Sequence, residues 1–142
     1  MSKSVEDPKK AGALIVSGHA EGLKKAIALL EEFNLPLGLL PLENVVELGY
    51  VKSTGYIWIT QAKPIQHQFK LIGNLVSYAT EINGYLAKNA ISKLSGVKAK
   101  ELFIWANVNE ISLGDPSAGK IHFKAFGGIA KIFPVEAFAT GQ

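Results

Sequence analysis

The clearest pattern along the chain is one stretch with helical spacing. Apolar residues recur every three or four positions between Leu23 and Phe33, which places them on one face of a helix. Asn34 and Pro36 follow directly, and these residue types end helices. The pattern therefore predicts one α-helix over residues 19–34, and no later segment has comparable spacing.

The rest of the chain is typical of antiparallel β-strands. Apolar and β-branched stretches, several of them alternating with polar residues, are separated by short turns that contain glycine, asparagine or proline. The expected strands are residues 13–18, 44–51, 56–60, 65–72, 75–87, 98–113, 120–126 and 129–138. Pro134 marks the last of them as an edge strand or as an interrupted one.

The expected strand over residues 98–113 is too long to stay straight. It would measure about 50 Å at ~3.3 Å per residue, whereas a compact chain of this length is about 30 Å across. We therefore expect a strong bend at a bulge near residues 107–110. The run Leu102 to Trp105 is apolar on both faces, which predicts a strand covered on both sides. One cover would be the helix, and the other either a second layer of the curled sheet or a bound ligand.

These elements predict an α+β fold that is mostly β. One N-terminal helix would pack on a strongly curved antiparallel sheet or partly open barrel. A chain of 142 residues fits a single domain. Residues 1–10 are charged and lack apolar periodicity, so we expect a disordered leader there and one globular domain over residues 11–142.

The segment LPLGLLPL, residues 35–42, is irregular yet almost wholly apolar. Pro36 and Pro41 prevent it from forming a helix or a central strand. We expect its leucines to plug one end of the curled sheet, and the sequence leaves open whether they contact a partner instead.

Composition narrows the function classes. The chain has no cysteine, which excludes disulfides and thiolate chemistry and favours a cytoplasmic location. No apolar run approaches the ~18 residues of a transmembrane segment. All 15 basic residues are lysines, and they are scattered along the chain. Because lysine lacks the planar fork that grips phosphate or guanine, a nucleic-acid partner is not expected.

Several stretches come in an order and spacing that match a known family: NLPLGLLPL, TGYIWI, LVSYATEINGYL, LSGVKAKELFIWANVNEI, DPSAGKIHFK and KIFPVEAF. Over residues 13–138 the chain resembles the land-plant family catalogued as domain of unknown function 538. The resemblance implies a helix against a strongly curved antiparallel sheet, likened to half of a lipid-binding domain of the bactericidal permeability-increasing type. For activity, it implies either binding of a lipid or small molecule or ester hydrolysis.

The candidate catalytic group centres on His67. If the protein is an enzyme, His67 would act with Ser77, Tyr78 or Glu81, since a hydrolase needs a nucleophile, a base and an acid. The sequence has no G-x-S-x-G elbow, and a hydrogen-bonded, half-buried His67 is the simpler interpretation.

The other two histidines predict no metal site. His19 lies at the expected start of the helix, as a surface or capping residue, and His122 lies on a strand face with Lys120 and Lys124. No two histidines have the i, i+2 or i, i+4 spacing of metal ligands, so neither a metal nor another cofactor is expected.

Aromatic residues form the most suggestive set. Tyr56 and Trp58 share one expected strand face, and Phe103 and Trp105 share another. Rings of this kind line apolar ligand grooves, in which tyrosine hydroxyls fix the ligand. The candidate ligand-binding residues are Tyr56, Trp58, Phe69, Tyr78, Phe103 and Trp105.

The function expected from these features is a non-catalytic binding or carrier protein for an apolar small molecule or lipid-like compound in plants. One alternative is a small esterase-like hydrolase or proton-transfer enzyme acting on a plant metabolite. The other is a protein-interaction module that uses residues 35–42 or the edge near Pro134. The ligand, the pathway and the oligomeric state are left open.

Overall fold

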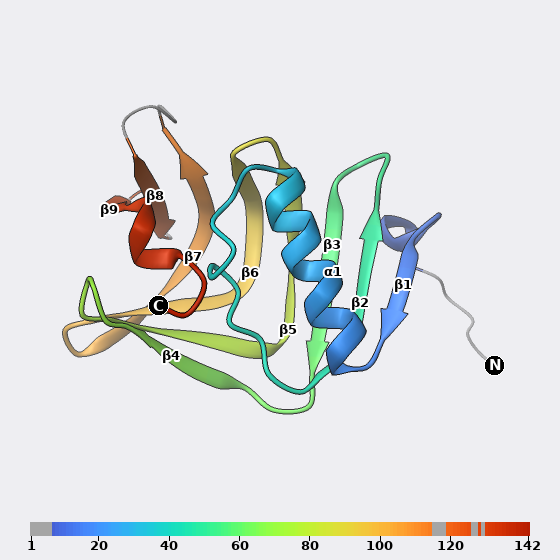
Figure 1. Cartoon of the computed structure of the whole chain (residues 1–142), viewed down its shortest axis with the longest axis horizontal. Coiled ribbons are helices and arrows are strands. Elements are labelled where there is room, and N and C mark those ends of the chain that lie inside the picture. Colours follow the sequence, from blue (N-terminus) through green and yellow to red (C-terminus); the bar gives the residue numbers. More distant parts are fainter. Residues whose placement is uncertain (1–6, 115–118, 126–127, 129) are drawn as a thin grey trace.

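The computed structural model describes residues 7–114, 119–125, 128 and 130–142. In this part of the chain, one helix packs on one antiparallel sheet of nine strands (Figure 1). The strands are β1 (Leu14–Ser17), β2 (Val45–Val51), β3 (Tyr56–Gln61), β4 (Ile65–Phe69), β5 (Asn74–Ala87), β6 (Ala90–Glu101), β7 (Ile104–Leu113), β8 (Lys120–Ala125) and β9 (Ala130–Pro134).

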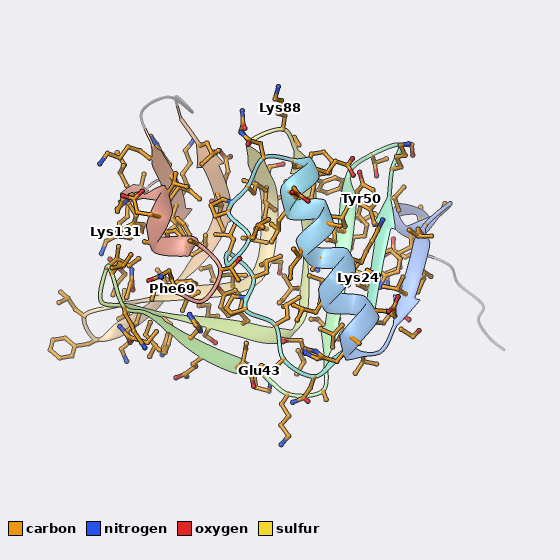
Figure 2. All side chains as sticks on the ribbon, viewed as in Figure 1. Lys24, Glu43, Tyr50, Phe69, Lys88 and Lys131 are labelled. Atoms are coloured by element: carbon orange, nitrogen blue, oxygen red, sulfur yellow. The ribbon has the colours of Figure 1, made fainter. Side chains whose placement is uncertain are left out.

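The strands follow the order β1-β2-β3-β5-β6-β7-β8-β9, and β4 pairs with β5 beside this path. The sheet is not closed, so the predicted α+β fold with a curved, open sheet is confirmed. We call the side that carries the helix the concave face. Phe69 points into this interior and Lys88 points outward (Figure 2).

The helix α1 (His19–Glu32) packs against β1 and β2 through its apolar stripe. Leu29 and Leu30 are almost fully buried. Asn34 adopts a left-handed conformation with φ 61°, and the N–H of Leu35 donates to the carbonyl of Leu30 at 2.8 Å. This arrangement ends the helix as the sequence predicts, because asparagine tolerates the left-handed conformation that closes the last turn.

The leucine segment, residues 35–42, is covered by the protein's own core. Leu35, Leu39, Leu40 and Leu42 are buried. The expectation that this segment plugs one end of the sheet is wrong. The segment runs beside α1 across the middle of the concave face, towards the C-terminal residues (Figure 1).

Gly38 explains how the leucine segment reaches that position. Its N–H donates to the carbonyl of Phe138 at 2.9 Å. A Cβ atom at this position would collide with the carbonyl groups of Phe138 and Ala139. The close approach of two backbones therefore requires glycine.

The prediction of one strand over residues 98–113 is wrong. The chain reverses at Leu102 and Phe103, where a two-residue turn joins β6 to β7. This turn carries no glycine or asparagine, and Leu102 itself takes the left-handed conformation with φ 53°. Local turn rules assign that conformation to glycine, asparagine or aspartate. The expected irregularity near residues 107–110 is confirmed, since the register of β7 against β8 shifts between Val108 and Glu110.

The C-terminus also differs from the expected strand over residues 129–138. The strand β9 is an edge strand that ends at Pro134, as the proline predicts. Val135–Phe138 then form a short 3-10 helix, η3, whose Phe138 is fully buried. Residues 126 and 129, at the ends of two expected strands, lie outside the described residues.

At the N-terminus, Pro8–Lys10 form a 3-10 turn, η1, that contacts β2. The other part of the expected leader, residues 1–6, lies outside the described residues.

The sheet curls back on itself between β6 and β9. These two strands are three places apart in the strand order. In a flat sheet the pairings would place Lys131 in line with Phe123, Ile111 and Ile91, ten residues of β6 away from Glu101, or about 33 Å at ~3.3 Å per residue. Yet Lys131 Nζ of β9 lies 2.6 Å from Glu101 Oε1 of β6. The C-terminal strands therefore fold back over the concave face and enclose space there.

Candidate functional site

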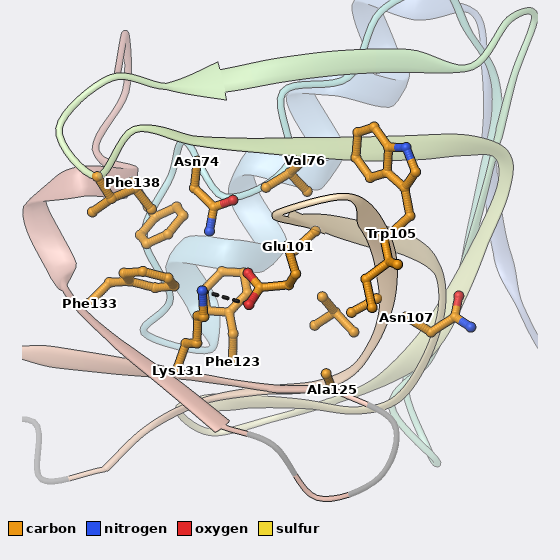
Figure 3. Close-up of a pocket in the computed structure, with 15 residues that line it drawn as sticks. Asn74, Val76, Glu101, Trp105, Asn107, Phe123, Ala125, Lys131, Phe133 and Phe138 are labelled. Atoms are coloured by element: carbon orange, nitrogen blue, oxygen red, sulfur yellow. Dashed lines mark ion pairs between the residues drawn. The ribbon is translucent and has the colours of Figure 1, made fainter.

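A pocket of about 320 Å³ lies inside this curl. It is bounded by β5, β6, β7, β8, β9 and η3 (Figure 3). Of the fifteen described residues that line it, eleven are apolar and four are polar. This composition is typical of a site for an apolar ligand with a few polar anchoring points.

Small side chains create the space. Ala99 of β6 and Ala106 of β7 form a directly opposed pair in the ladder, so their methyl groups lie side by side on the pocket wall. Ala125 of β8 adds a third small residue. Leucine or phenylalanine at these positions would fill the volume, since side chains on one face of a curled sheet converge.

Three phenylalanines form the opposite wall. The Phe123 ring stacks on the Phe138 ring at 5.0 Å between centroids, and the Phe133 ring meets the Phe123 ring edge-on at 5.6 Å. Phe69 supports the group from behind, 4.7 Å from Phe138. Rings that contact one another in this way are held by packing and by edge-to-face attraction. The rings of the wall therefore support one another through the protein's own packing.

Four polar residues belong to the pocket lining. Glu101 and Lys131 form an ion pair, Asn74 is another member of the lining, and Asn107 lies apart from the pair and points away from it (Figure 3). Both partners of the pair are partly exposed, with 47% of the Lys131 side chain and 27% of the Glu101 side chain open to water. The pair therefore lies at the mouth, where pocket and solvent meet.

The predicted pair Tyr56 and Trp58 lies on the other side of the sheet. Their neighbours on β3, Ile57 and Ile59, face the main core. Trp58 covers Gly49 of β2, where a Cβ atom would collide with the indole ring. Its Nε1 donates to Glu47 Oε2 at 2.7 Å, and Lys10 Nζ lies 4.6 Å from the ring centroid. The N-terminal turn thus covers this pair, which forms a separate small cluster away from the pocket.

Tyr56 has a raised pKa. Burial of its phenol is the main cause, and the negative charge of Asp7 and the phenol of Tyr85 add to it.

Phe69 and Tyr78, two other predicted ligand residues, belong to the main core. Tyr78 is buried, its hydroxyl donates to the Leu39 carbonyl at 3.0 Å, and burial raises its pKa. That bond ties β5 to the leucine segment.

Phe103 and Trp105 lie at the end of the β6–β7 hairpin. The Phe103 side chain is 94% exposed, so the apolar run Leu102 to Trp105 is not covered on both sides as expected. The reason is the turn at Leu102 and Phe103, which places this run at the tip of a hairpin and not in the middle of a strand. Trp105 belongs to the pocket lining and is half-buried. It is directly opposite Lys100 in the ladder, and Lys100 Nζ lies 5.1 Å from its ring.

The candidate catalytic residues are not assembled into one group. In the ladder between β4 and β5, His67 is opposite Val76 and Ser77 is opposite Gln66. Since opposed residues share a face and neighbours alternate, His67 and Ser77 point to opposite sides of the sheet. Tyr78 is committed to the core, and Glu81 is exposed. None of these four residues lines the pocket.

His67 has a structural partner. It is half-buried, and its Nε2 lies 3.0 Å from the carbonyl oxygen of Gln142, so the predicted hydrogen-bonded histidine is confirmed.

The other two histidines lie elsewhere in the fold. His19 is the first residue of α1, and its Nδ1 accepts the N–H of Val45 at 3.2 Å. His122 is half-buried on β8, between the buried Ile121 and Phe123.

Within the described residues, no group of three or more histidine, cysteine, aspartate or glutamate side chains is placed to hold a metal ion. No helix in the same part of the chain is long and apolar enough to cross a membrane.

The phenylalanine wall and the alanines opposite it were not among the residues predicted from sequence. Alternation within β8 does place Phe123 between Ile121 and Ala125 on one face, which is a usable local signal. Nothing local indicates that β9 returns to β6, because this depends on the curl of the whole sheet.

The comparisons with known proteins agree with the resemblance that the sequence motifs carry. The chain has no match among curated proteins and none among solved structures. The sequence model described as "Protein of unknown function, DUF538" matches residues 26–139, which include the second half of α1, the leucine segment and every strand from β2 to β9. The chain therefore belongs to the DUF538 family.

Proposed function

We propose that this protein binds an apolar small molecule or lipid-like compound, without catalysis, in the pocket between β5–β9 and η3. The observation that carries the proposal is the apolar pocket of about 320 Å³ with a preformed phenylalanine wall. Ligand pockets in proteins have volumes of roughly 300–1,000 Å³, so the volume suits a small ligand.

The apolar part of the ligand would lie against Phe123, Phe133 and Phe138. Its polar end would face the Glu101–Lys131 pair at the mouth, where both a carboxylate and an ammonium group are available. The described lining contains no histidine, serine or tyrosine, which supports binding over hydrolysis. The resemblance to a land-plant family supports a plant metabolite as ligand, and the absence of cysteine supports a cytoplasmic location.

The protein-interaction alternative receives less support. Four of the five leucines in residues 35–42 are buried against the protein's own core, so this segment has little surface left for a partner. The edge strand β9 remains open on one side.

Filling the pocket tests the proposal. Ala106→Phe places a ring in the cavity, and Ala87→Phe adds the same ring at an exposed position of β5 as the control. The probe is a fatty acid with a fluorescent nitrobenzoxadiazole group, titrated into the purified full chain. We expect saturable binding to the wild type and to Ala87→Phe, and at least tenfold weaker binding to Ala106→Phe.

Circular dichroism of each variant shows whether the fold is retained. Binding of equal strength in folded Ala106→Phe and wild type would overturn the assignment of the pocket. If the pocket assignment holds, mass spectrometry of compounds that co-purify with wild type, but not with Ala106→Phe, would identify the chemistry of the natural ligand.

A further inference from the structure

The turn between β6 and β7 presents apolar side chains to solvent. Leu102 is 89% exposed, Phe103 94% and Ile104 65%. We call these three residues the apolar tip. The adjacent turn between β4 and β5 adds Leu71, which is 59% exposed. The two turns lie side by side, because the start of β5 pairs with the end of β6, where Val76 is opposite Ala99.

Folding of the hairpin does not explain the apolar tip. Two-residue turns favour glycine, asparagine or aspartate where φ is positive, and Leu102 occupies such a position with φ 53°. Phe103 contributes almost nothing to the core, since nearly all of its surface is open. Both side chains are therefore retained at a cost in local strain and in exposed apolar surface. Strain and exposed apolar groups of this kind cluster at functional surfaces.

Lysines surround the apolar tip. Lys98 and Lys100 of β6 are exposed beside it, and Lys70 is exposed in the neighbouring turn. The nearby acid is Glu101, and its charge is already matched by Lys131. The tip thus combines protruding apolar side chains with a positively charged collar.

We propose that the apolar tip inserts into the surface of a membrane that contains anionic phospholipids, with Lys70, Lys98 and Lys100 contacting the headgroups. Apolar side chains next to lysines are the combination that binds anionic bilayers peripherally, because burial and charge attraction add. Trp105, directly below the tip, lies at the level where tryptophan favours the membrane interface. The cytoplasmic leaflet carries such anionic lipids.

The size of the tip favours a bilayer over a protein partner. A stable protein interface buries roughly 800 Å² on each partner. A leucine and a phenylalanine that protrude from a turn bury far less, since even a phenylalanine buries only about 150–250 Å². A bilayer needs no matching surface and accepts single side chains between its headgroups.

Docking through the tip also bears on the pocket. Because Ile104 belongs both to the tip and to the pocket lining, a docked tip would place the pocket next to the bilayer. Transfer of a lipid-like ligand between bilayer and pocket rests on the proposed function, whereas docking itself does not. A variant with a filled pocket should therefore still dock.

The experiment is co-sedimentation of the full chain with vesicles at physiological ionic strength. One vesicle type contains phosphatidylcholine with about a third phosphatidylserine, and the other phosphatidylcholine alone. The tip variant is Leu102→Asn with Phe103→Ser, because asparagine keeps the left-handed conformation available. The control is Ile15→Ser with Val46→Ser, two exposed apolar positions at the other end of the sheet. Their exposed fractions are 52% and 50%.

We expect wild type and control to bind anionic vesicles at least tenfold more tightly than neutral ones. The tip variant should lose at least tenfold in binding to anionic vesicles. Lys98→Gln with Lys100→Gln should lose the preference for anionic lipid, and Ala106→Phe should bind like wild type. Absence of wild-type binding, or full binding by the tip variant, would overturn the proposal, and the tip would then be assigned to a protein partner.

Tryptophan fluorescence gives a second readout. The chain has two tryptophans, so Trp58→Phe leaves Trp105 as the reporter. Anionic vesicles with brominated acyl chains should quench Trp105 strongly. Unquenched Trp105 in sedimented, vesicle-bound protein would show that another surface docks, which overturns the assignment to the tip.

Discussion

The two halves of the concave face are built in different ways. Over the N-terminal strands, α1 and the leucine segment fill the space, and Leu29, Leu30 and Leu39 are each only 1% exposed. Over β5 to β9 the sheet curls back on itself, and a pocket of about 320 Å³ remains between alanines and phenylalanines. Protein interiors normally pack as densely as organic crystals. The first half follows this rule and the second does not, so the two halves should respond differently to the same kind of substitution.

The largest expected effect comes from removing a side chain from the filled half. Leu39→Ala should lower the free energy of unfolding by about 3 kcal/mol, because it leaves a cavity that the surrounding side chains cannot close. Ile104→Ala, at the rim of the pocket, should cost less than about 1 kcal/mol, because that side chain is already 65% exposed. Urea unfolding with an unchanged m-value gives both numbers. Equal losses in the two variants would mean that the halves do not differ in packing.

The sequence predicts the filled half well. Helical spacing between Leu23 and Phe33 identifies α1, and Pro36 with Pro41 identifies an irregular apolar segment. These signals are local, because each depends on residues within one or two turns of the chain. The predicted position of the leucine segment is wrong, because the actual position depends on the approach of Gly38 to Phe138, 100 residues away.

The sequence predicts the pocket half less well, for two physical reasons. The turn at Leu102 breaks a local rule, so the apolar run predicts the middle of a strand where the chain in fact reverses. The curl that brings Lys131 to Glu101 is a property of the whole sheet and leaves no pattern in either strand. Alternation correctly paired Tyr56 with Trp58 on one face. It could not tell that this face is covered by the N-terminal turn instead of facing the pocket.

Enlarging an alanine gives a smaller and sharper test of the same contrast. Ala26 on α1 is 1% exposed in the filled half, and Ala106 lines the pocket. Ala26→Leu should destabilise the protein by about 1–3 kcal/mol, because a full core has no room for three more carbon atoms. Ala106→Leu adds the same atoms next to empty space and should be neutral or slightly stabilising. Thermal melts of both variants measure the difference, and a loss of stability in Ala106→Leu as large as in Ala26→Leu would show that the pocket half is also full.

The smallest expected effect on stability concerns the ion pair at the mouth of the pocket. Glu101 and Lys131 are both partly exposed, so their coupling energy in a double-mutant cycle should be about 0.5 kcal/mol and should fall with added salt. The variants Glu101→Gln and Lys131→Gln, with their combination, complete the cycle. Glu110→Gln is the control, because it removes a comparable exposed pair with Lys124, 3.6 Å long, and neither of these residues lines the pocket.

If the pair spans the mouth, its loss should matter more for exchange of a bound molecule than for folding. The fluorescent fatty acid should leave Lys131→Gln and Glu101→Gln several times faster than wild type, and Glu110→Gln at the wild-type rate. Stopped-flow displacement measures these rates. A coupling energy above about 2 kcal/mol would instead make the pair a main support of the curl, since such values belong to buried pairs with good geometry. In that case both single variants should lose the pocket together with stability, and the contrast between a filled and an open half would depend on this one contact.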